Sequence, residues 1–378
     1  MTFVNFVRFM SKFRQISKGW QTPVPNELRG REPHGSIVRG VGKQCIYLCG
    51  VEGFSLKARF LAAAAASAAL LAACSGGGST IVPSNNNTQP QSGDREFTTL
   101  SLFAAQNNTT GETVRVFPTR ETVDAFRATQ VGQRQVQAVS NLTYHGGPIQ
   151  TNPKIYVVFW GSSWNGSGDP NGVKARANAW FPVIGGSGWN NSTTQYTQSN
   201  GQHVGNQTGS FVGSYVDTTS SPPTIPTQSQ IANEAAKAAA HYGDYSANAS
   251  YVVALPHGIR PSGFGTQFCA WHSSATVSGK GTIAYTNDPY LPDVGASCGA
   301  NSVNGGSAGT LDGISIVYGH EQAETETDPQ PNTGWLDSSN AENGDKCAWI
   351  NLINNPNAGG YPTQPLWSNT NSGCVQTY

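Results

Sequence analysis

A histidine and two glutamates near residue 320 are spaced as the ligands and base of a metal site would be. The segment reads His320-Glu321-Gln322-Ala323-Glu324. On a helix, residues i and i+4 lie on one face, so His320 and Glu324 can hold one ion through a nitrogen and an oxygen, both of which zinc accepts. Glu321 lies where the glutamate of an H-E-x-x-H helix serves as the general base that activates water. The spacing therefore predicts a zinc-dependent hydrolase in which Glu324 replaces the second histidine of that motif.

A catalytic zinc site needs a third protein ligand. We predict Glu342, because it follows His320 by 22 residues, close to the spacing in zinc peptidases that use a later glutamate. The residues left open as alternatives are Asp345, Asp328, His272 and His257. Asp345 is also a candidate for orienting His320 through a hydrogen bond. Calcium is the alternative ion, but it prefers six to eight oxygen ligands, and His320 therefore favours zinc.

The elements that position these residues follow from local composition. Continuous apolar runs predict strands, and Ala-rich or periodic segments predict helices. The expected strands are 113–117, 154–161 and 251–256, and the expected helices are 173–181, 229–242 and 314–327. Pro182 is expected to stop the first helix, Ser229 to cap the second, and Asp328 to lie beyond the third, because Pro329 follows it. Residues 95–378 are therefore predicted to form a single loop-rich α/β (mixed α+β) domain, with a mixed sheet and an active-site helix.

The chain before this domain has the features of an export signal. In residues 55–74 a basic start precedes an apolar run, which ends in Leu71-Ala72-Ala73-Cys74. That run is too short for a membrane span, which needs about 20 residues, and its end is similar to the bacterial lipoprotein box. We predict a lipoprotein signal peptide at 55–74, membrane attachment through a lipid on Cys74, and a flexible linker at 75–94. Residues 1–54 are interpreted as a mis-called start or an extension.

Four cysteines in the domain support an exported, oxidised protein. They allow three pairings, and their order favours Cys269–Cys298 and Cys347–Cys374. Each bond would close a loop of roughly 30 residues and stabilise the domain by about 3 kcal/mol in the loop-entropy interpretation. The expected location is the cell envelope, at the outer membrane or the cell surface.

The zero net charge of the whole chain conceals an acidic domain. Of 22 Lys+Arg and 22 Asp+Glu, residues 1–73 contain 10 basic and 3 acidic ones, which leaves 12 basic and 19 acidic residues from Cys74 onward. This balance argues against nucleic-acid binding, which requires a basic face. The expected partner is instead a peptide or protein substrate. Several of the acids surround His320, where we place the function.

Several ordered blocks of the sequence resemble the EXORDIUM (phosphate-induced protein) family. The blocks are 141–149, 156–164, 263–272, 284–298, 320–329, 334–335 and 342–347. The last ones are similar to the bacterial members that retain His-Glu. This resemblance implies an extracellular protein with a metallopeptidase-like core. Plant members have generally lost the His-Glu pair and are associated with growth responses, so the resemblance also implies an alternative: a non-catalytic surface binding protein with a structural ion or none.

Overall fold

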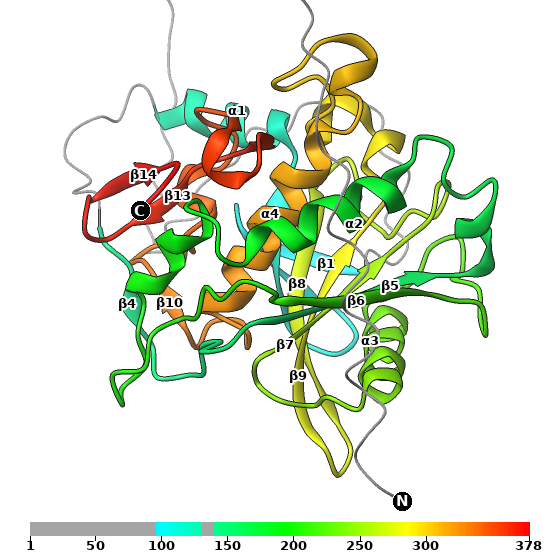
Figure 1. Cartoon of the computed structure of the whole chain (residues 1–378), viewed down its shortest axis with the longest axis horizontal. Coiled ribbons are helices and arrows are strands. Elements are labelled where there is room, and N and C mark those ends of the chain that lie inside the picture. Colours follow the sequence, from blue (N-terminus) through cyan, green and yellow to red (C-terminus); the bar gives the residue numbers. More distant parts are fainter. Residues whose placement is uncertain (1–95, 131–139) are drawn as a thin grey trace, which may run out of the picture. The chain divides into compact units, whose positions relative to one another are not determined.

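An eight-stranded mixed sheet is the centre of the protein in the computed structural model, which describes residues 96–130 and 140–378 (Figure 1). In spatial order its strands are β1 (Phe97–Ser101), β2 (Ala104–Asn107), β3 (Thr113–Pro118), β8 (Phe268–Val277), β9 (Gly281–Asp288), β7 (Ala249–Ala254), β5 (Lys154–Trp160) and β6 (Phe211–Asp217). β9, β7, β5 and β6 run parallel to one another, whereas β1, β2, β3 and β8 pair in antiparallel fashion. The predicted α/β class with a mixed sheet is confirmed.

Helices cover both faces of the parallel half of the sheet. They are α2 (Val173–Ile184), α3 (Gln228–Tyr242) and α4 (Asp312–Thr327), whereas α1 (Arg120–Gln130) packs against the turn Gly295–Cys298. The chain passes from β5 through α2 to β6 on one side of β5, and then returns through α3 to β7 on the other side. Right-handed crossovers that move in opposite directions place their helices on opposite faces, and Figure 1 shows α2 with α4 on one face and α3 on the other. β5 and β7 are accordingly apolar and buried along almost their whole length.

Helix α4 is enclosed on all sides, and each of its 16 residues is buried. It contacts the sheet on one side, and α2 and β12 on others. Gly319 allows the close approach of α2, because a Cβ at this position would lie 2.9 Å from the Trp180 ring. The acidic C-terminal half of α4 is therefore part of the interior, where each charged group needs a partner.

Two helix boundaries differ from the sequence prediction. The stop at Pro182 is wrong: α2 continues to Ile184. Proline removes one hydrogen bond, but Phe181 and Ile184 are fully buried in the core, and this packing maintains the last turn. The Ser229 cap is also wrong, because Thr227 caps α3 in a reciprocal capping box with Gln230. The end of α4 before Asp328 is confirmed.

Short strands, single turns and two disulfides hold the C-terminal loops together. The short sheets pair β4 (Thr143–Tyr144) with β10 (Trp335–Leu336), β11 (Ile353–Asn355) with β12 (Tyr361–Thr363), and β13 (Leu366–Ser368) with β14 (Gly373–Val375). The 3-10 turns are η1 (Ser162–Asn165), η2 (Asn190–Gln195), η3 (Leu291–Asp293), η4 (Gly295–Cys298), η5 (Gly306–Gly309), η6 (Asp345–Cys347) and η7 (Pro356–Ala358). The disulfides Cys269–Cys298 and Cys347–Cys374 join Cα atoms 5.4 and 5.8 Å apart, as predicted from their order.

The predicted signal peptide at 55–74, its Cys74 and the linker at 75–94 lie outside the described residues, as does the segment 1–54. Within the described ranges, the helices are too short or too polar to cross a bilayer.

Candidate metal centre

The site is built around the last two turns of α4 and a segment that folds back onto them. The Asp345 amide donates to Glu324 Oε1 at 2.9 Å. Asn343 Nδ2 donates to the Ala323 carbonyl at 3.0 Å and to Thr327 Oγ1 at 2.8 Å. These bonds tie the segment to the last turns of α4. They also place residues 342–345 beside the helical face that carries His320 and Glu324.

The sheet contributes two further residues from neighbouring strands. Arg115 on β3 and His272 on β8 are register partners. Cross-strand partners project from the same face of a sheet, and here that face is the one beneath α4. Both side chains are buried, at 1% and 0% exposure.

The His320 group, which consists of His320, Glu324 and Asp345, has the geometry of a metal site. His320 Nε2 lies 3.1 Å from Glu324 Oε2 and 3.7 Å from Asp345 Oδ1. Zinc–ligand distances of 2.0–2.2 Å in a tetrahedron imply donor atoms about 3.3–3.6 Å apart. The three donor atoms all lie within 4.8 Å of one another, so small side-chain movements suffice to complete the site.

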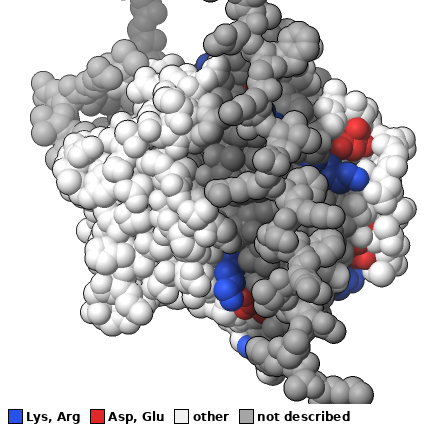
Figure 2. All heavy atoms as spheres, viewed as in Figure 1, with Lys and Arg blue, Asp and Glu red and all other residues white. Residues whose placement is uncertain are grey.

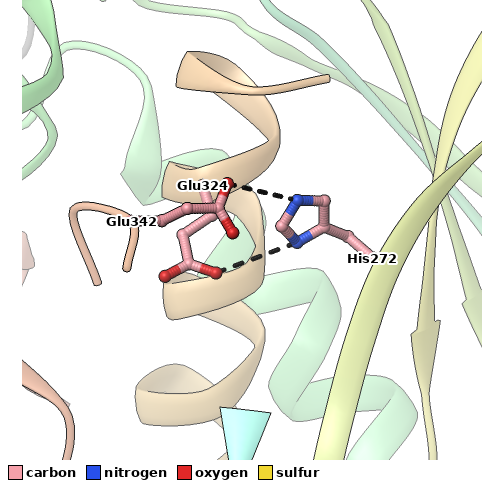
Figure 3. A group of neighbouring side chains, drawn as sticks. All are labelled: His272, Glu324 and Glu342. Atoms are coloured by element: carbon pink, nitrogen blue, oxygen red, sulfur yellow. Dashed lines mark ion pairs between the residues drawn. The ribbon is translucent and has the colours of Figure 1, made fainter. Parts of the chain in front are cut away.

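The His272 group consists of His272, Glu324 and Glu342 and shares Glu324 with the His320 group (Figure 3). His272 Nε2 lies 3.6 Å from Glu342 Oε1, and Nδ1 lies 3.8 Å from Glu324 Oε2. Glu321 Oε2 accepts a hydrogen bond from Nδ1 at 3.0 Å. This arrangement directs Nε2 away from Glu321, as in carboxylate–histidine–metal triads.

Arg115 holds the carboxylates of residues 342 and 345. Its Nε donates to Glu342 Oε2 at 2.7 Å, its Nη2 to Asp345 Oδ2 at 3.1 Å and also to the Asn340 carbonyl. Burial would lower the pKa of Arg115, but the negative charges of Glu342 and Asp345 outweigh burial and raise it. The guanidinium is therefore a permanent charge that fixes one oxygen of each carboxylate.

The ionisable groups of the site have strongly shifted pKa values. Burial, reinforced by neighbouring carboxylates, raises the pKa of Glu324 and of Asp345 well above the usual range. Burial also acts on Glu342, but Arg115 and His272 outweigh it and lower its pKa to about 2. Burial lowers the pKa of His320, which favours the neutral imidazole that binds metal. The pKa of His272 is raised, because Glu342 and Glu321 outweigh burial.

Three neighbours fix the ring of His320. Phe117 stacks on it with ring centroids 3.9 Å apart, and Gln364 Nε2 lies 3.0 Å from Nδ1. A metal at Nε2 requires the proton on Nδ1, so the Gln364 carboxamide must then turn its Oε1 towards the ring, which gives up the hydrogen bond that its Nε2 donates to the Gly344 carbonyl at 2.9 Å. A Cβ at Gly344 would lie 2.6 Å from Nδ1 and 2.9 Å from Glu324 Oε1.

The structure brings most of the sequence candidates together and divides them between the two groups. His320 and Glu324 converge with Asp345, one of the alternatives, whereas Glu342 faces His272. The carboxylate of Asp328 instead accepts hydrogen bonds from the amides of the following turn, including Gly334 at 2.7 Å. His257 belongs to neither group and pairs with Asp293 at the surface.

The sequence interpretation gave no role to Arg115 or Gln364. A signal for Arg115 is present, because the strand Thr113–Pro118 is otherwise apolar and almost wholly buried. An arginine in such a strand is rarely buried without an acidic partner. Gln364 lies in a loop between β12 and β13, and its type and neighbours carry no comparable signal.

Most acidic side chains of the described domain are buried rather than exposed at its surface. Figure 2 shows few charged side chains on the visible face outside the grey residues. Five acidic residues between 321 and 345 are in or beside the site, and each is at most 2% exposed: Glu321, Glu324, Asp328, Glu342 and Asp345. Burying so many acids is costly unless cations or protons compensate them.

In comparisons with known proteins, no family model, curated protein or solved structure matched the chain. The resemblance to the EXORDIUM family therefore stays a prediction.

Proposed function

We propose that the protein is a zinc-dependent hydrolase of the metallopeptidase type, with the metal held by His320, Glu324 and Asp345. One observation carries this proposal. His320 Nε2 and Asp345 Oδ1 are buried, point to a common position beside Glu324 Oε2, and have no hydrogen-bond partner among the described residues. Buried polar atoms normally have partners, so their lack of one here supports a bound cation.

The chemistry of the donors suits zinc better than calcium. One nitrogen and two carboxylate oxygens form a mixed set that zinc accepts, whereas calcium requires six to eight oxygens. Zinc in such a set supplies Lewis-acid polarisation of a carbonyl and lowers the pKa of water.

Glu321 is suited to hold a proton beside this site. Its Oε2 is engaged by His272 Nδ1. Its Oε1 is buried and accepts no hydrogen bond from the residues that the structure describes. A carboxylate with one oxygen fixed and the other free can accept a proton in a defined direction. Glu321 therefore retains the role of general base that the sequence motif predicts.

Burial favours a second candidate function, that of a non-catalytic extracellular protein with a structural ion. The donors of both groups are at most 2% exposed. Structural zinc sites are closed by protein, whereas catalytic sites keep one position open. In this alternative the metal stabilises the contact between α4 and the C-terminal loops, and the protein binds rather than cleaves its partner.

We also propose that the domain acts outside the cytoplasm, attached through a lipid on Cys74. Two disulfides in the described domain support an oxidising compartment. The sequence before residue 95 supplies the signal and the anchor.

Metal analysis with peptide hydrolysis tests the function. The purified protein should contain zinc and cleave a library of internally quenched peptides. Glu321→Gln should retain zinc but lose at least about 100-fold in kcat, the contribution typical of a general base. Glu234→Gln, the same change in a buried glutamate on α3, should leave hydrolysis intact. Zinc without hydrolysis would favour the structural ion, and a protein that binds no metal would contradict both functions.

A further inference from the structure

We infer that the site holds two metal ions, with the carboxylate of Glu324 shared between them. This inference rests on the metal binding proposed above and extends it from one ion to two. The His320 group and the His272 group each supply one histidine and one carboxylate of their own, Asp345 and Glu342 respectively. Glu324 belongs to both groups.

The two histidines share a free Nε2 but differ in how Nδ1 is held. In both rings Nε2 is buried and has no hydrogen-bond partner among the described residues. His272 Nδ1 donates to Glu321 at 3.0 Å, as in metal-binding histidines. His320 Nδ1 lies 3.0 Å from the amide nitrogen of Gln364, and it can donate in the same way only when that carboxamide turns over.

In each of the two carboxylates outside α4, those of Glu342 and Asp345, one oxygen is bound and the other is free. Arg115 binds Glu342 through Oε2 and Asp345 through Oδ2. Their other oxygens, Glu342 Oε1 and Asp345 Oδ1, are buried and accept no hydrogen bond within the described ranges. One oxygen therefore faces each histidine, at 3.6 Å from His272 Nε2 and 3.7 Å from His320 Nε2.

Glu324 lies between these two pairs. Its Oε1 accepts the Asp345 amide, whereas Oε2 lies 3.1 Å from His320 Nε2 and 3.8 Å from His272 Nδ1, the nitrogen that also donates to Glu321. One carboxylate oxygen thus lies within 4 Å of both imidazoles, and donor atoms of His272, Glu324 and Glu342 all lie within 4.8 Å of one another. In two-metal hydrolases the ions are about 3.5–4 Å apart, a separation that a single shared carboxylate can span.

A single ion would leave the site incomplete. In the His320 group alone, it would leave His272 Nε2 and Glu342 Oε1, which lie 3.6 Å apart, buried without a hydrogen bond from the described residues. Four carboxylates of the two groups and their contacts, Glu321, Glu324, Glu342 and Asp345, are accompanied by one permanent cation, Arg115, which binds Glu342 and Asp345. Once metal binding has displaced the protons of these carboxyl groups and of His272, one divalent ion leaves a net charge of −1 on this set and two leave +1.

Titration of the chelator-treated full chain with Co²⁺ tests this inference. We expect two Co²⁺ per chain by metal analysis. The first should produce a high-spin EPR signal, and the second should diminish it, because ions bridged by one carboxylate are magnetically coupled. His272→Gln should reduce the stoichiometry to one and restore the uncoupled signal, and His320→Gln should do the same. His257→Gln, outside both groups, should retain two coupled ions.

The possible results separate this inference from the proposed function. One Co²⁺ per wild-type chain, with hydrolysis intact, would overturn the two-ion site and leave the hydrolase standing. Two ions whose signals simply add would overturn the sharing of Glu324. The wild-type measurements decide both points even where a histidine variant does not fold. Failure to bind Co²⁺ at all would overturn the metal site itself.

Discussion

The protein buries two clusters of acidic side chains and compensates their negative charge in different ways. Beside α3, burial and the neighbouring Asp217 raise the pKa of Glu234 to about 7, which favours a proton on that carboxyl group. Lys237 lies 2.8 Å from Glu234 and 3.9 Å from Asp217, and Thr219 donates to Asp217 twice. In the metal centre, by contrast, four carboxylates face one arginine, and several donor atoms have no partner in the described structure.

The difference shows that buried acids alone do not indicate a metal site. The α3 pair is compensated by a proton, a lysine and hydroxyl groups, and it contains no histidine. In the centre on α4 the raised pKa values of Glu324 and Asp345 likewise favour protons when no ion is bound, but here two histidines have a free Nε2, and their rings are fixed by Glu321, Gln364 and Phe117. A bound cation can replace those protons only in this second cluster, and the following changes test the contrast.

Replacement of the arginine should have the largest effect. Arg115→Met should destabilise the protein by about 3–5 kcal/mol, because it leaves the carboxylates of Glu342 and Asp345 buried without their partner. Lys237→Met, the corresponding change at the α3 pair, should cost less than about 1 kcal/mol, because this lysine is half exposed. Urea denaturation measures both free energies of unfolding. Equal losses of unfolding free energy in the two variants would mean that both clusters depend on their cation to the same extent.

Filling the space beside His320 should have an intermediate effect. Gly344→Ala places a Cβ against His320 Nδ1 and Glu324 Oε1 and displaces both without removing a donor. We expect zinc affinity to fall by roughly 10–100-fold, as for the loss of supporting contacts, and stability by about 1–3 kcal/mol. Gly305→Ala is the control, because its Cβ would meet nothing within 4 Å. Zinc affinity unchanged in Gly344→Ala would show that these two residues do not hold the ion.

The smallest effect should come from a substitution in the Asp217–Glu234 pair beside α3. Burial, helped by Asp217, raises the pKa of Glu234 to about 7 from 4.5. The folded state therefore binds this proton more tightly, and its stabilising contribution is complete below pH 4.5 and is lost as the pH rises to about 7. The lowered pKa of Asp217 affects stability only at more acidic pH, near and below 3.8, and does not change this trend. Glu234→Gln should thus raise stability at pH 8, relative to pH 5, by about 1 kcal/mol compared with wild type.

Thermal unfolding at pH 5 and pH 8 measures this change, and metal content provides its control. Glu234→Gln should bind as much zinc as wild type. An unchanged pH dependence of stability would show that no proton is shared by the α3 pair.

The sequence predicted the local part of the centre. His320 and Glu324 lie one turn apart, so their convergence follows from helix geometry alone. The end of α4 before Asp328 follows similarly from Pro329. The disulfide pairs followed from the order of four cysteines, because each pair closes a short loop.

The rest depends on contacts between distant segments. Arg115 meets Glu342 across 227 positions of sequence, and only the pairing of β3 with β8 places it beside His272. Spacing along the chain favoured Glu342 as the third ligand, whereas the fold turns Asp345 towards His320 and Glu342 towards His272. The geometry of the fold-back at residues 342–345, set by Asn343 and Arg115, decides this division. Spacing carries no information about it.

Anomalous X-ray diffraction at the zinc edge, on crystals grown with zinc, tests the central claim most directly. We predict a peak about 2.0–2.2 Å from His320 Nε2, Glu324 and Asp345 Oδ1, with a second peak beside His272 Nε2 and Glu342. A map without density at either position, in crystals whose zinc is confirmed by fluorescence, would contradict the metal centre.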